Sequence, residues 1–250
     1  ASEEEKNKWR KRILHEINLA VKVQKNFLPK RNLENYPVQG INFAAREISG
    51  DFFSFYPHND SIYFIIADVA GKGVHAGMVM AKTSTLFELL SQDKIDLDEM
   101  MLHINNDLFI TKTGGMFVTS ILGTYDLNTD EVLWVNGGHQ PAVIRDSKGN
   151  FEEIFSDAPP LGVIKQKNKS IYKINKKKLN GSRFYVFTDG LSESLNEKNE
   201  EIGIGGSKLI INNNYNKDLK IQLNNIAKEV INKTKDKKLI DDLTIVAIGK

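Results

Sequence analysis

Cysteine is absent from this sequence of 250 residues, and long apolar runs are absent as well. Without cysteine the chain holds no disulfide and no thiolate metal site, which fits a reducing cytoplasm. The longest apolar run, residues 64–67 with their flanks, is far too short to span a bilayer, and no signal-peptide pattern is visible. We therefore expect a cytoplasmic domain, although the full-length protein could still be attached to a membrane elsewhere.

A strong excess of either charge is also missing, because 34 Lys and Arg residues face 32 Asp and Glu residues. The net charge of +2 gives no reason to expect nucleic acid or an anionic membrane as a partner. Lysine gathers in residues 165–178 and 228–238, which we interpret as solvated surface. The first residues contain no methionine, so we expect a fragment of a longer protein with an upstream sensor.

Apolar residues recur at three- to four-residue spacings near the N-terminus, which predicts one long helix over residues 4–28. Its apolar stripe consists of Trp9, Ile13, Ile17, Val21 and Leu28, and Pro29 ends the helix. We divide the chain into this linker or regulatory helix, residues 1–30, and a second domain, residues 31–250. The stripe either packs on its own domain or pairs with the same helix of a second molecule, and we favour the homodimer.

The rest of the chain alternates short β-rich runs with turns, which predicts strands at residues 40–48, 52–57, 61–69, 116–127, 131–138, 182–190 and 243–249. Helical patterns cover residues 74–90, 97–110 and 219–233. Many strands joined by hairpins, with helices set apart, indicate an α+β fold of antiparallel sheets covered by helices.

Four aspartates lie where a predicted strand meets a turn: Asp51, Asp68, Asp189 and Asp241. Taken singly, each is more often a turn or cap residue, because Asp readily bonds its own backbone. Taken together, carboxylates at strand ends form an acidic pocket of oxygen ligands. Such a pocket suits Mg²⁺ or Mn²⁺ better than zinc.

Two glycine-rich stretches could be mistaken for nucleotide loops. The first, Gly71-Lys72-Gly73, lacks the upstream glycine and the Ser or Thr after lysine that a P-loop requires. We interpret its glycines as a tight turn beside Asp68. The second, residues 201–206, follows no clear strand and is interpreted as a turn into a helix.

The stretches ISGDFFSF, IADVAGKGVHAGMVMA, FVTSILGTYDLNTDEVLWVNGGHQPAVI, PPLGV, FTDGLSESLN and DDLTIVAI resemble, in this order, motifs of bacterial metal-dependent protein phosphatases. The resemblance is to the SpoIIE/RsbU branch of the PPM, or type 2C, superfamily, and it covers residues 22–250. It implies two packed antiparallel sheets flanked by helix pairs, an α-β-β-α sandwich preceded by the long helix.

The resemblance also implies roles for the aspartates. Asp68 would bridge two Mn²⁺ or Mg²⁺ ions, Asp189 and Asp241 would complete one, and Asp51 with the carbonyl of Val69 would hold the other. Asp242 would orient its neighbours, and Gly190 belongs to the same motif as Asp189. The ions would activate a water for attack on a phosphoserine or phosphothreonine.

The source of the proton for the leaving group stays open at this stage. Eukaryotic-type relatives carry a histidine where this chain has Ala70, so a water on the metal is the first choice, with His75 and His139 as alternatives. A structural role for His139 is favoured over a catalytic one. A second departure is Ser54, which replaces an aspartate of many relatives and puts any further metal contact there in doubt.

The resulting hypothesis is a protein serine/threonine phosphatase that forms the output domain of a bacterial signalling or stress-response protein. The substrate implied is a phosphorylated regulatory protein, such as an anti-sigma-factor antagonist of the STAS type. In this branch the linker helix can carry an upstream signal to the metal site. The alternatives are a weakly active or inactive phosphatase fold that binds a regulatory partner, and a two-metal nuclease, which the near-neutral charge disfavours.

Overall fold

The computed structural model describes residues 2–29, 33, 36–111, 113–156, 158–196, 198–234 and 238–250. The helices in these ranges are α1 (Glu3–Gln24), α2 (Val74–Gln92), α3 (Leu97–Thr111), α4 (Asp189–Ser192), α5 (Gly203–Asn213) and α6 (Leu219–Lys233). The strands are β1 (Val38–Phe43), β2 (Phe52–His58), β3 (Ser61–Val69), β4 (Val118–Asp126), β5 (Glu131–Gly137), β6 (Ala142–Arg145), β7 (Phe151–Ile154), β8 (Asn175–Lys178), β9 (Arg183–Phe187) and β10 (Leu243–Ile248).

The strands form two antiparallel sheets of five strands each, in the orders β1-β10-β9-β6-β7 and β2-β3-β4-β5-β8. In β3, Ile62, Phe64 and Ile66 point into the core between the sheets. Ile65, Ala67 and Val69 on the opposite face pack toward α2 and α3. The strand is therefore apolar on both faces, as expected for a central strand covered on each side.

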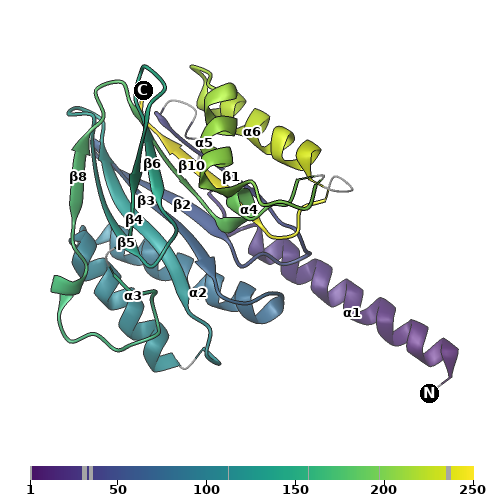
Figure 1. The fold of residues 1–250 in the computed structure, drawn as a ribbon. Coiled ribbons are helices and arrows are strands. Elements are labelled where there is room, and N and C mark those ends of the chain that lie inside the picture. The colour runs from purple at the N-terminus through teal and green to yellow at the C-terminus, as the bar shows by residue number, and fades with distance from the viewer. Residues whose placement is uncertain are drawn as a thin grey trace.

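The helices cover the outer faces of the two sheets (Figure 1). One apolar cluster joins α2 and α3 to the β2–β3–β4–β5 sheet, and another joins α5 and α6 to the β9–β10 sheet. The core between the sheets contains large aromatic side chains, among them Phe64, Trp134 and Phe184. The expected α-β-β-α sandwich is confirmed, as is the pairing of its helices.

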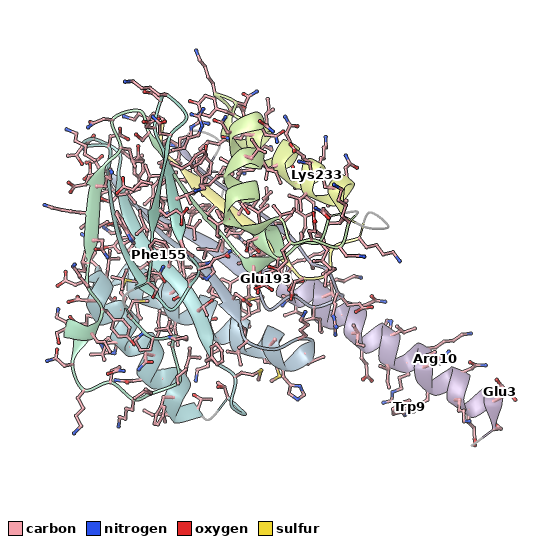
Figure 2. All side chains as sticks on the ribbon, in the orientation of Figure 1. Glu3, Trp9, Arg10, Phe155, Glu193 and Lys233 are labelled. Atoms are coloured by element: carbon pink, nitrogen blue, oxygen red, sulfur yellow. The ribbon has the colours of Figure 1, made fainter. Side chains whose placement is uncertain are left out.

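Helix α1 extends away from this sandwich, and Glu3, Trp9 and Arg10 lie far from the sheets (Figures 1 and 2). Ser2 caps its first turn, with its side chain accepting from the Glu5 N–H and the Glu5 carboxylate accepting from the Ser2 N–H. No residue of α1 is buried. The expected long helix is present, and among the described residues only its C-terminal end contacts the sandwich, through Gln24.

Two expectations need correction. The first helix ends at Gln24 rather than at residue 28, because the chain turns at residues 25–27 and Leu28 packs against the sandwich. The short strands β6, β7 and β8 and the short helix α4 were missed, whereas the turn into a helix expected at residues 201–206 leads into α5. The proposed domain boundary between residues 30 and 31 lies outside the described residues. Within the described ranges, no helix combines the length and apolar character needed to cross a bilayer.

Candidate metal centre

Asp51 and Asp68 lie side by side at one end of the β2–β3 hairpin. Phe52 pairs with Ala67 in the antiparallel ladder, so the residues next to them, Asp51 and Asp68, occupy neighbouring positions at the hairpin's open end. The charge of Asp68 contributes to the raised pKa values of Asp51 and of Asp189, which shows that these carboxylates lie close together. The fold thus places these two predicted residues next to each other.

The other two predicted aspartates come from the facing sheet. Strand β9 ends just before Thr188 and Asp189, while β10 begins just after Asp241 and Asp242. The Thr188 N–H donates to the Thr244 carbonyl (3.0 Å), which holds these two strand ends together. Because the sheets are stacked, the ends of β2, β3, β9 and β10 meet at one edge of the sandwich, and the charge of Asp241 reaches Asp68 and Asp189.

Asp51 is the most enclosed carboxylate of the cluster, with 3% of its surface exposed. Its Oδ2 accepts hydrogen bonds from the hydroxyls of Thr188 (2.5 Å) and Thr244 (3.0 Å). Burial, followed by the charge of Asp68, raises the pKa of Asp51 well above its usual range despite these hydroxyls. The two threonines therefore fix the direction of a carboxylate that is costly to ionise without a cation.

Asp68 and Asp189 are partly exposed and receive less hydrogen-bonding support. Burial is the main cause of the raised pKa of Asp68, with further contributions from the charges of Asp241 and Asp242. Burial, and then the charges of Asp68, Asp241 and Glu193, raise the pKa of Asp189 to about 7. Like charges so close together oppose ionisation, and a bound cation would reverse that effect.

Lys72 supplies a positive charge to this cluster. Its Nζ lies 2.6 Å from Asp241 Oδ2, and this contact is the main cause of the raised pKa of Lys72. The lysine stands in a tight turn between Gly71 (φ 131°) and Gly73 (φ 82°), a conformation that side chains other than glycine rarely adopt. The glycines thus bring Lys72 to the aspartates, as expected for a turn rather than a P-loop.

Both carboxylate oxygens of Asp242 accept hydrogen bonds from the segment that precedes Asp51. Its Oδ1 accepts from the Ala45 N–H (2.8 Å), and its Oδ2 accepts from the Ser49 hydroxyl (2.7 Å) and the Gly50 N–H (3.0 Å). These bonds fix the segment that leads into Asp51. The expected orienting role is the one that this geometry supports.

Gly190 allows two of the motifs to approach each other. A Cβ at this position would lie 1.9 Å from the carbonyl oxygen of Asp242, so any larger residue would push the two strand ends apart. The proximity of Asp189 to Asp241 and Asp242 depends on this glycine.

His139 is buried between the two sheets and lies behind the carboxylates. Its Nε2 donates to the Phe187 carbonyl (3.1 Å), which leaves Nδ1 to accept from the Thr119 hydroxyl (2.9 Å). Burial lowers the pKa of His139 to about 4. Both ring nitrogens are engaged, so the geometry favours the structural role. His75 is exposed on the first turn of α2.

Four residues that the sequence analysis did not single out support the centre: Gln24, Ser49, Thr188 and Thr244. Three of them lie within the motifs SGD, TDG and DDLT, where their hydroxyl groups next to aspartates were an available signal. The fourth, Gln24, donates to the Ser49 carbonyl (2.6 Å) and accepts from the Ser49 N–H (3.0 Å). Nothing in the local sequence indicates that contact.

The donor set fits a hard divalent cation in its chemistry, since it offers only oxygen ligands. The Val69 carbonyl also faces this region, because a Cβ on Gly50 would lie 3.2 Å from its oxygen. In the described part of the chain, however, no three His, Asp or Glu side chains are arranged so that they could hold a metal ion as they stand. Lys72 on Asp241 and the threonines on Asp51 explain why the carboxylates do not already point to one centre.

A family model described as stage II sporulation protein E (SpoIIE) matches residues 58–250. This chain belongs to the SpoIIE family. Among SpoIIE-family relatives, RsbU of Bacillus subtilis, named a phosphoserine phosphatase, is 24% identical over 95% of this chain and 71% of RsbU. Protein IcfG of Synechocystis is 25% identical over 93% of this chain, which spans only 41% of IcfG. RsbP of Bacillus subtilis, also named a phosphoserine phosphatase, is 26% identical over 71% of this chain and 45% of RsbP.

The solved structures similar to this SpoIIE-family chain confirm the fold. The SiaA-PP2C domain of Pseudomonas aeruginosa superposes with a TM-score of 0.84 at 16% identity, covering 96% of this chain and 98% of that domain. The PP2C phosphatase domain of SpoIIE from Bacillus subtilis gives a TM-score of 0.70 at 21% identity, covering 86% of this chain and 64% of that structure. These structures confirm the fold, and the family match to residues 58–250 confirms the resemblance inferred from the motifs.

Proposed function

We propose that this chain is a metal-dependent protein serine/threonine phosphatase. The observation that carries the proposal is the meeting of Asp51, Asp68, Asp189 and Asp241 at one edge of the sandwich. Two of its relatives are named phosphoserine phosphatases, and the structure of RsbX, with a TM-score of 0.61 at 19% identity, is described as a complex with magnesium. These findings support serine phosphatase chemistry that depends on a divalent ion.

The residues that would hold two Mn²⁺ or Mg²⁺ ions are divided between the two sheets. Asp51 and the Val69 carbonyl would hold one ion, Asp189 and Asp241 the other, and Asp68 would lie between them. Bound ions would provide Lewis acidity and charge neutralisation for the attack of water on a phosphate ester. The chain's own contribution is to keep the carboxylates at fixed places, through Thr188 and Thr244 on Asp51 and through Asp242 on the segment before it.

The proton for the leaving oxygen does not come from His139 in this proposal. Its pKa of about 4 leaves the ring neutral at pH 7, and its Nε2–H already donates to Phe187. His75 is the remaining candidate among the two histidines, because it is exposed one turn from Lys72. A solvent water held in the centre is the alternative that the sequence analysis preferred.

The test of the function is phosphate release from a phosphoserine protein in the presence of Mn²⁺. We expect turnover that stops when the metal is chelated and returns when Mn²⁺ is added back, because the carboxylates alone provide no nucleophile. Mn²⁺ at 100 times its Kd should also stabilise the fold by about 2.7 kcal/mol. Turnover that survives exhaustive chelation would contradict the proposal, and Mn²⁺ binding without turnover would support the partner-binding alternative instead.

The proposed setting is a cytoplasmic signalling protein whose substrate is a phosphorylated regulator of the anti-sigma-factor-antagonist type. The chain spans less than half of the length of IcfG and of RsbP, so more than half of each relative lies outside the matched region. In our proposal an upstream sensor acts through α1.

Two observations support a regulatory and dimerising role for α1. Gln24 at its end is hydrogen-bonded to Ser49, whose hydroxyl binds Asp242, so the helix is connected to the metal centre. Several apolar side chains of the helix are uncovered, with exposed fractions of 68% for Trp9 and 57% for Val23. A second copy of α1 would bury Trp9, which lies on the same side of the helix as Ile13 and Ile17, with Ile13, Ile17 and Val21 at the seam.

Sedimentation of Ile13→Asp and Ile17→Asp variants tests this role, with Lys11→Asp on the same helix as the control. We expect the two isoleucine variants to sediment as monomers and to change in turnover, whereas the control keeps the mass of the parent. If the parent itself is a monomer, α1 is not an interface. If both variants match the parent in mass and turnover, α1 is neither an interface nor a switch.

A further inference from the structure

A groove runs along the first half of α2 from the Gly71-Lys72 turn, which lies beside the carboxylate cluster. Helix α2 covers the outer face of the β2–β3 sheet (Figure 1). Its volume is about 730 Å³. One wall comes from α2, with Met78 and Val79, and the other comes from residues 113–116, ending at Met116. A volume of this size is within the range of sites that bind molecules much larger than a phosphate group.

The inner end of the groove joins the carboxylate cluster. Gly71 and Lys72 form this end, and Lys72 Nζ contacts Asp241 at 2.6 Å. The opposite wall closes against the same turn, since a Cβ on Gly71 would lie 3.3 Å from Met116 Sδ. A chain lying in the groove would therefore enter the metal centre beside Lys72.

Met78 gives the outer part of the groove an apolar surface, with an exposed fraction of 68%, beside Thr111 and Thr113. The other lysine in the lining, Lys82, is paired with Asp107 (2.6 Å), so its charge is already balanced. Exposed apolar side chains beside a polar centre are typical of binding surfaces, and methionine adapts to varied partners.

The charges at the two ends indicate which molecule fits. The inner end carries the ammonium of Lys72, which is paired with Asp241 here and becomes available to a phosphate dianion when bound cations take that carboxylate. The outer end suits apolar side chains. A phosphoserine with apolar neighbours in sequence combines both properties in one extended segment.

We propose that this groove binds the apolar residues that flank the phosphoserine of the protein substrate. The proposal rests on the phosphatase function above and adds a recognition rule to it. Lys72 meets the phosphate at the inner end while the flanking side chains lie against Met78 and Met116. Small phosphate esters, which lack flanking residues, do not use the groove.

The experiment compares two phosphoserine peptides, one with Leu and Ile beside the phosphoserine and one with Gly and Ser there. Their kcat/KM values are measured with Mn²⁺ alongside p-nitrophenyl phosphate. We expect the apolar peptide to be preferred by about tenfold, mainly through KM, as for one well-buried anchor side chain. Equal kcat/KM values for the two peptides would overturn the proposal.

Met78→Glu should remove the preference, lowering kcat/KM for the apolar peptide about tenfold relative to p-nitrophenyl phosphate measured with the same variant. Leu89→Glu is the matched control, because Leu89 lies three turns further along α2 with an exposed fraction of 53% and outside the groove. An equal loss in both variants, or a loss shared by p-nitrophenyl phosphate, would contradict the proposal.

Two further measurements separate this proposal from its alternatives. If no substrate is hydrolysed, the phosphatase function fails, and fluorescence anisotropy of the labelled peptides in the presence of a chelator still decides whether the groove binds the apolar one. If Met78→Glu changes the sedimenting mass, the groove is covered by a second copy of the chain, and the proposal is wrong.

Discussion

The enclosed part of the carboxylate cluster, Asp51 and Asp242, is held by many hydrogen bonds, whereas the open part, Asp68 and Asp189, faces mainly other carboxylates. Asp242 accepts from two backbone N–H groups and a hydroxyl, and Asp51 accepts from two hydroxyls. Burial and neighbouring negative charges raise the pKa values of Asp68 and Asp189, as they do that of Asp51, but these two carboxylates lack the pair of hydroxyl donors that Asp51 has.

The difference concerns how firmly each carboxylate is held. The enclosed carboxylates are fixed in position, because each is tied to more than one strand end or turn, and Asp51 is also a proposed metal ligand. The open carboxylates carry charge that the protein leaves largely uncompensated apart from Lys72. Such a local conflict is expected where a ligand completes the site, and a divalent cation is the ligand that four carboxylates favour.

Replacing Asp68 with Asn tests the open part and should have the largest effect. Loss of one charge between two cations should lower phosphatase turnover by about 10²–10³-fold. The metal-free variant should unfold at a higher temperature than the parent, because repulsion from Asp241 and Asp242 is relieved. A gain of about 1 kcal/mol corresponds to ~2–4 °C in a domain of this size.

Calorimetry with and without Mn²⁺, together with turnover, measures both effects. Asp60→Asn is the control, since Asp60 is exposed at the opposite end of the same β2–β3 hairpin. A metal-free Asp68→Asn protein that is less stable than the parent would contradict the repulsion between the open carboxylates. Full turnover in this variant would contradict the role of Asp68 as a metal ligand.

Lowering the pH should change the stability of the metal-free fold in opposite directions through the buried His139 and through the open carboxylates. His139 stays neutral in the fold with a pKa of about 4, against 6.5 for an unperturbed side chain. Its contribution to stability is therefore complete above pH 6.5 and is lost as the pH falls toward 4, by about 3 kcal/mol over that interval. The open carboxylates have raised pKa values, so their protonation stabilises the metal-free fold over the same interval.

Urea unfolding of metal-free parent and His139→Gln proteins between pH 7.5 and pH 4 isolates the histidine. The variant should be less stable at pH 7.5, and the difference between the two proteins should shrink as the pH falls. A difference that is constant with pH would mean that His139 is protonated alike in the folded and unfolded chains.

Breaking the enclosed part is expected to have the smallest effect. Ser49→Ala removes the hydroxyl that donates to Asp242 and lies 3.1 Å from the Asp51 carbonyl oxygen, which should cost about 1–2 kcal/mol of stability. Mn²⁺ affinity, measured by titration calorimetry, should fall as the segment before Asp51 loosens. Ser147→Ala, in an exposed turn, provides the comparison, and equal Mn²⁺ affinity in all three proteins would deny Ser49 a role in the centre.

The sequence was sufficient for the parts of the fold with strong periodicity. The pattern of β3 predicted its bounds at residues 61–69, and α6 was predicted at residues 219–233, because apolar residues recur at the strand or helix period. Strand β8 was missed because it is four residues long and contains three lysines among residues 175–178. It lies at the edge of its sheet, where lysine protects against further pairing.

The sequence predicted which aspartates form the candidate centre, but it did not predict the long-range contacts that hold them. The aspartates could be placed because each follows or precedes a β-rich run, and the motif resemblance grouped them. The ion pair of Lys72 with Asp241 joins residues 169 positions apart, and the bonds of Gln24 to Ser49 join residues 25 apart. Local patterns carry no information on such contacts, which arise only when the two sheets and the end of α1 come together.

Crystals of the protein soaked in Mn²⁺, with anomalous diffraction recorded at the manganese edge, test the central claim most directly. The account predicts two peaks between Asp51, Asp68, Asp189 and Asp241, with Lys72 displaced from Asp241 and with Asp242 still bound to Ser49. Peaks elsewhere on the surface, or none at a Mn²⁺ concentration that supports turnover, would contradict it.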